Sequence, residues 1–220
     1  QSTELMPINE KTREIAERIV GRVRDPLAQG KALYDWVADR ALRDPETPAL
    51  SAGGIDTPPE LANALGRNAG HALLFVALAR AIGLPARPVF GLRCDYSKLF
   101  PSLGAMGELN RAFNCRAEFY APGYDWIPVN PADLRLAVLE EKLSPDDGKL
   151  AVLKKLLFGF WEMNWIGLNT ALEVTPQAAQ AGNGRALPFL ATPYVETGAN
   201  VLDTTDAERF SVSIKASRES

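Results

Sequence analysis

The stretch GRNAGHALLFVALARAIGLPARPVFGLR, residues 66–93, decides the fold. Apolar residues surround almost the whole circumference of residues 68–82, which predicts a helix that is buried on several sides. Gly83 and Pro85 end this helix, and residues 87–93 then read as a strand. We expect Asn68 at the start of the helix, where its side chain can cap the free amides of the first turn. A buried helix should therefore lead directly into a sheet.

Two further strands are expected downstream, over residues 113–120 and 124–129, with Pro122-Gly123 as the turn of a hairpin. In the first of them Cys115 alternates with Asn114, so the two side chains should point to opposite faces. Cys115 would then lie on an apolar face, where the thiol pKa is raised. We expect a structural role for Cys115.

Amphipathic helices are predicted on both sides of this region. Apolar spacing predicts helices over residues 10–20 and 27–42, the second capped by Asp25-Pro26, and the prolines of residues 43–62 predict a loop. The aromatic residues between 158 and 165 are expected to pack in the core. Closing strands are expected over residues 187–194 and 209–216.

Composition excludes several classes of function. The chain has 220 residues, and its 24 basic and 27 acidic residues are interspersed, which gives no footprint for nucleic acid. The apolar run 72–79 is far too short to span a bilayer. Two cysteines and one histidine exclude a zinc ribbon, a Cys-x-x-Cys redox site and a His-rich metal cluster. We expect no metal, no cofactor and no membrane span.

The motifs together resemble the transglutaminase-like family. That family places a nucleophilic cysteine, a histidine and an aspartate at the positions held here by Asn68, Asn114 and Asn130. The resemblance implies an α+β fold with a transglutaminase/papain-like (cysteine-protease-like) core in residues 1–135, a buried helix packed on an antiparallel β-sheet. It also implies a C-terminal α/β extension in residues 136–220 that packs on the core as one compact unit. Similar proteins are often bacterial and exported, so we expect export to the periplasm or the extracellular space, with the cytoplasm as the alternative.

Asparagine can act neither as the nucleophile nor as the proton carrier of a Cys-His-Asp triad, and it lacks the charge of the aspartate. Its amide neither ionises near neutral pH nor accepts and returns a proton, although it donates and accepts hydrogen bonds. The resemblance therefore predicts a catalytically degenerate protein, a pseudoenzyme rather than a cysteine-dependent transglutaminase or protease. Its former active-site cleft would bind a peptide, a small amide-bearing ligand or a partner protein. The binding residues predicted for this cleft are Asn68, His71, Asn114, Arg116, Glu118 and Asn130.

Alternatives remain open for several of these residues. The pocket could serve a non-thiol enzyme, a lyase, isomerase or cyclase, with the asparagines as hydrogen-bond donors and His71, Glu118 or Tyr120 as proton carriers. Arg116 and Glu118 are expected to pair with each other, and His71 to satisfy a local hydrogen bond. A disulfide between Cys94 and Cys115, the oligomeric state and a natural or introduced origin of the asparagines also stay open.

Overall fold

The computed structural model describes residue 6 and residues 8–43, 59–104, 112–175, 187–189, 194–197 and 200–202. For residues 43, 59–69, 187–189, 196–197 and 200–202 only the backbone is described. The predicted strand over residues 209–216 and most of the predicted loop, residues 44–58, lie outside these ranges.

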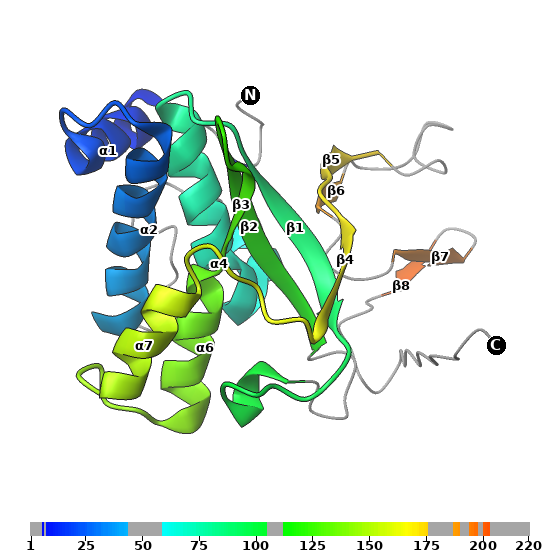
Figure 1. Ribbon diagram of the computed structural model, residues 1–220. Helices are drawn as coiled ribbons and strands as arrows, with labels where there is room; N and C mark the ends of the chain where they lie inside the picture. The colour runs from blue at the N-terminus through cyan, green and yellow to red at the C-terminus, as the bar shows by residue number, and fades with distance from the viewer. Residues whose placement is uncertain are drawn as a thin grey trace.

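Helices gather on one side of the central sheet (Figure 1). Asn9 caps the first helix by accepting from the Thr12 amide, and Asp25 caps the second by accepting from the Ala28 amide at 2.8 Å, which confirms the predicted Asp25-Pro26 start. No helix in the described part of the chain is long and apolar enough to cross a membrane. The helices are α1 (Glu10–Val20), α2 (Pro26–Arg43), α4 (Pro59–Ala81), α6 (Pro131–Glu141) and α7 (Gly148–Leu156), with the 3-10 turn η1 (Pro101–Leu103).

The central sheet has four antiparallel strands in the order β3-β2-β1-β4. These are β1 (Ala86–Arg93), β2 (Phe113–Ala121), β3 (Asp125–Val129) and β4 (Trp165–Asn169). β2 and β3 form the predicted hairpin, and β4 joins the opposite edge, beside β1. Two small pairs follow, formed by β5 (Leu172–Val174) with β6 (Leu187–Phe189) and by β7 (Val195–Thr197) with β8 (Asn200–Leu202). The fold is the expected α+β arrangement.

The core forms where α4 packs on β2. Residues 72–79 are all buried, and the rings of Phe75 and Phe119 meet edge to face with centroids 5.8 Å apart. Cys115, Ala117 and Phe119 all belong to this core, as strand alternation predicts. Gly30 allows α2 to approach β2 closely, because a Cβ atom at position 30 would lie 2.3 Å from the Phe119 ring.

The start of α4 differs from the prediction. The helix begins at Pro59, so residues 59–62 are helical and Asn68 lies inside the helix instead of capping it. Pro59 at the first helical position, followed by the good helix formers Glu60, Leu61 and Ala62, gives the physical reason. The strand expected over residues 187–194 is also shorter, because Tyr194 lies outside β6.

Candidate functional site

Two of the three asparagines bind one residue, Asp133, one through its carboxylate and the other through its backbone amide. Asn114 on β2 is buried and donates from Nδ2 to Oδ1 of Asp133 at 3.1 Å, while its own Oδ1 accepts from the Cys115 amide. Asn130 caps α6, and its Oδ1 accepts from the Asp133 amide at 3.2 Å. Asn68 lies on α4, and only its backbone is described. The structure thus brings Asn114 and Asn130 together through Asp133.

Asp133 is also the centre of a buried ion-pair cluster. Arg93 Nη2 at the end of β1 donates to Asp133 Oδ1 at 2.5 Å, and Arg116 Nη2 lies 3.7 Å from Oδ2. All of these side chains are buried. We call Arg93, Asn114, Arg116, Asn130 and Asp133 the Asp133 cluster.

The electrostatics of the cluster follow from two guanidinium groups that share one carboxylate. Burial is the main cause that lowers the pKa of Arg116 to about 10, while Asp133 opposes this change and Arg93 adds to it. Asp133, the acceptor at the centre, is already bound by both arginines and by Asn114. With two guanidinium groups and one carboxylate, the cluster carries one excess positive charge.

Sequence reasoning missed Asp133 and Arg93. A usable signal for Asp133 is the spacing of Asn130 and Asp133, which matches an N-cap residue followed three positions later by an acidic residue at the start of a helix. Arg93 shows no comparable signal, because its partner lies 40 residues away in the chain.

A short segment, residues 157–165, crosses the cluster between α7 and β4. On one side, the Asn130 amide donates to the Leu157 oxygen at 2.9 Å and the Gly159 amide to the Pro128 oxygen at 2.8 Å. On the other side, the Cys94 amide donates to the Asn164 oxygen at 2.8 Å. We call this segment the strap, since hydrogen bonds tie it to both ends of the site.

The strap places two indole rings over the cluster. Trp161 Nε1 donates to the Val129 oxygen at 3.1 Å, and Arg116 donates to the Glu162 oxygen at 3.1 Å. The Arg116 guanidinium lies 4.6 Å from the centroid of the Trp165 ring, a favourable cation–π distance. Gly91 pairs with Asn114 across the sheet, and a Cβ atom on Gly91 would lie 2.3 Å from the Trp165 ring. Close packing of the strap therefore covers the strands beside Asn114.

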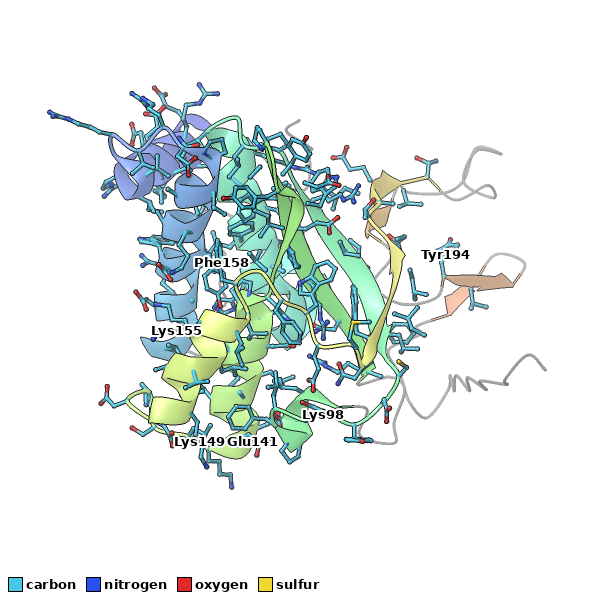
Figure 2. The ribbon with its side chains drawn as sticks, viewed as in Figure 1. Lys98, Glu141, Lys149, Lys155, Phe158 and Tyr194 are labelled. Atoms are coloured by element: carbon cyan, nitrogen blue, oxygen red, sulfur yellow. The ribbon has the colours of Figure 1, made fainter. Side chains whose placement is uncertain are left out.

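Only part of the aromatic segment packs in the core as predicted. Phe158 contacts the rings of Tyr34 and Phe119, with centroids 5.4 and 6.0 Å apart, between α2 and the sheet (Figure 2). Phe160 instead lies on the surface, and Trp161 and Trp165 pack against each other over Arg116.

The remaining predicted site residues lie in different surroundings. His71 is buried on α4, and burial, with Arg135 as the second cause, lowers its pKa to about 3, so its imidazole is neutral near pH 7. The predicted Arg116–Glu118 pair is wrong: Arg116 binds Asp133, whereas Glu118 accepts from Arg87, its partner across the β1–β2 register. Tyr120 packs edge to face on Trp126. The proposed proton carriers therefore do not converge on Asn114.

The two cysteines lie in different environments. Cys115 is buried in the core, and burial raises its thiol pKa well above the ordinary value. Cys94 is exposed, and both cysteines are free, so the structure has no Cys94–Cys115 disulfide. The strand register explains this, because Cys115 pairs with Phe90 and the end of β1 separates it from Cys94.

A cavity of about 500 Å³ is lined by the strap and by residues of the segment 95–99. The Glu162 carboxylate fixes one wall by accepting from Ser97 Oγ at 2.7 Å and from the Lys98 amide at 2.6 Å. Met163 and Tyr96 are 90% and 67% exposed. Among the residues that the structure describes, no group of three or more His, Cys, Asp or Glu side chains could hold a metal ion. The lining of this strap cavity is Asp95, Tyr96, Lys98, Leu99, Phe160, Glu162, Met163 and Asn164.

Comparison with known proteins agrees with this architecture. Residues 13–131, more than half of the chain, match the core domain of the transglutaminase-like superfamily. A Haemophilus influenzae protein, described only as uncharacterized, is 32% identical over 212 residues, which cover 90% of this chain and 56% of the relative. The chain thus spans a little over half the length of that relative. The chain belongs to the transglutaminase-like superfamily.

Proposed function

We propose that this protein is a catalytically degenerate transglutaminase-like protein that binds a peptide or amide-bearing ligand beside its former active site. The observation that carries the proposal is the bond from Asn114 to Asp133, a carboxylate that Arg93 and Arg116 already neutralise. An imidazole in a triad needs a carboxylate that is free to stabilise its positive charge. Two adjacent guanidinium groups would disfavour an imidazolium at position 114.

The environment of Asn68 supports the same conclusion. A cysteine nucleophile is commonly activated at a helix N-terminus, where unpaired amides stabilise the thiolate. Position 68 lies within α4, nine residues beyond its first residue, so the backbone there does not offer a free helix end. Neutral His71, one turn later, supplies no positive charge to such a nucleophile.

We assign binding to the strap cavity because the strap that lines it is hydrogen-bonded to the Asp133 cluster. Arg116 in the Asp133 cluster holds the main chain of Glu162, and Glu162 with Asn164 lines the cavity. Exposed Tyr96 and Met163 supply apolar surface, while the Asp95, Lys98 and Asn164 side chains supply polar groups. This mixture suits a peptide, whose apolar side chains alternate with amide donors and acceptors. In this proposal Asn114, Arg116 and Asn130 support the site from behind the strap.

The catalytic part of the proposal is tested with a glutamine-bearing peptide. Release of ammonia and transfer to an added amine are measured for the natural chain and for the Asn68→Ala variant. We expect no turnover above background from either protein. Turnover by the natural chain that Asn68→Ala abolishes would overturn the assignment.

The binding part is tested with the same peptide carrying a fluorophore. Fluorescence anisotropy should show saturable binding, and Tyr96→Ala or Met163→Ala should weaken it about tenfold, as expected for a central aromatic or apolar contact. Tyr124→Ala is the matched control, because Tyr124 is 66% exposed but lies in the β2–β3 turn. Equal effects of the Tyr96 and Tyr124 variants, or no saturable binding, would reject the strap cavity as the site.

A further inference from the structure

A second cavity, which shares only Lys98 and Leu99 with the lining of the strap cavity, lies at the other end of α6. It has a volume of about 540 Å³, within the range of small-molecule sites. The chain before η1 forms one wall, and the end of α6 with α7 forms the other. Lys98, Glu141 and Lys149 lie around this end of the molecule (Figure 2). We call it the α7 groove, and its lining is Lys98, Leu99, Phe100, Pro101, Glu141, Leu143, Lys149, Val152, Leu153 and Leu156.

The wall formed by α7 leaves apolar side chains open to water. Val152 and Leu156 are one helical turn apart and therefore share a face, while Leu153 is buried below them. Val152 is 59% exposed and Leu156 40%. A ligand that covers both side chains gains roughly 25 cal/mol for each Å² of apolar surface removed from water.

The charges of the α7 groove favour an anion. Lys98 and Lys149 are exposed, and neither ammonium forms an ion pair within the described ranges, whereas Lys154 of the same helix lies against Asp35 and Asp39. Glu141 is the acidic residue of the lining, and its Oε1 is bound to the Ser102 amide at 2.8 Å. Two lysines and one glutamate leave one uncompensated positive charge.

We propose that the α7 groove binds a medium-chain aliphatic carboxylate. Its chain lies along Val152 and Leu156, and its single negative charge lies at the rim beside Lys98 and Lys149. One negative charge matches the net charge of the lining, whereas a doubly charged phosphate head would leave one uncompensated negative charge. An aliphatic amine would place a second positive charge beside the two lysines.

Calorimetric titration with decanoate, decylamine and decanol tests this proposal. We expect saturable binding of decanoate and at least fivefold weaker binding of the amine and the alcohol. Equal affinity for all three, or no saturable binding of decanoate, would overturn it.

Variants test the position of the ligand. Lys149→Gln should weaken decanoate binding about three- to fivefold, as expected for an exposed ion pair, and Val152→Glu should abolish it. Lys155→Gln is the matched control, since Lys155 is an exposed lysine of α7 outside the groove lining. An equal loss in the Lys155 variant would contradict the proposal.

Two further measurements test whether the α7 groove has a different occupant and whether the two cavities act separately. If the ligand-free protein self-associates in sedimentation and Val152→Glu makes it monomeric, the groove binds a second copy and the proposal fails. Tyr96→Ala should leave decanoate binding unchanged, and Lys149→Gln should leave peptide binding unchanged. Failure at the strap cavity is thereby distinguished from failure at the α7 groove.

Discussion

Two arginines of the same strand bind carboxylates in opposite environments. At one end of β1, Arg93 binds Asp133, and the two side chains are 1% and 3% exposed. At the other end, Arg87 binds Glu118, and their side chains are 40% and 12% exposed. Each site also places an arginine over a tryptophan, Arg87 on Trp126 and Arg116 on Trp165. Loss of one member of the buried cluster therefore leaves charges without water or a partner. Loss of one member of the exposed pair leaves a charge that water can solvate.

The largest loss of stability is expected from Asp133→Ala. Removing the carboxylate leaves Arg93 and Arg116 buried without a counter-charge, which should lower the free energy of unfolding by about 3–5 kcal/mol. Urea denaturation measures this change. Asp146→Ala, at an exposed aspartate before α7, is the control and should change stability by less than about 0.5 kcal/mol. A loss at position 133 below about 1 kcal/mol would remove the contrast with the exposed pair.

Gly91→Ala tests the packing of the strap over the cluster. A Cβ atom at this position would lie 2.3 Å from both the Trp165 ring and the Ile166 oxygen, so the strap must shift. We expect a loss of about 1–3 kcal/mol, typical of overpacking, together with altered tryptophan fluorescence. Gly148→Ala is the control, because nothing lies within 4 Å of a Cβ atom there. Unchanged fluorescence in the Gly91 variant would contradict the packing of Trp165 on β1.

His71 shows how a buried group behaves without a counter-ion. Its pKa is 6.5 in the unfolded chain and about 3 in the folded protein, so below pH 6.5 the unfolded state binds the proton more strongly. Stability therefore falls as the pH falls from 6.5 towards 3, with about 2 kcal/mol lost by pH 5. The difference in unfolding free energy between the natural chain and His71→Gln, measured from pH 8 to pH 5, isolates this contribution. A difference that stays constant with pH would show that folding leaves the pKa of His71 unchanged.

The smallest loss of stability is expected from Glu118→Gln. The pair with Arg87 is partly exposed, and such pairs contribute about 0–1 kcal/mol. Urea denaturation at low and high salt measures the change, and salt should reduce it further. A loss as large as that of Asp133→Ala would show that exposure does not govern the two sites.

Local patterns predicted much of the fold. Helical spacing and the Asp25-Pro26 cap located α1 and α2, and alternation placed Cys115, Ala117 and Phe119 in the core. The predicted start of α4 was wrong because Asn68 resembles an N-cap residue, whereas the helix begins at Pro59, in the first helical position.

Long-range pairing limited the prediction of the site. Arg116 could have bound Glu118 on its own strand face or Asp133 on α6, and only the way that α6 follows β3 decides between them. Long-range packing also decides the positions of the aromatic residues in the strap. Phe158 packs in the core, but Trp161 and Trp165 cover Arg116. Amphipathic pattern alone does not reveal which buried surface a tryptophan covers.

The strap has a consequence for the order of events during synthesis. Asp133 and both of its arginines leave the ribosome before residues 157–165, which supply the indole rings that cover them. Until Trp165 has been translated, this group of charges lacks that cover and stays open to water. The nascent chain therefore covers the Asp133 cluster only after the whole span matched by the family, residues 13–131, has been made.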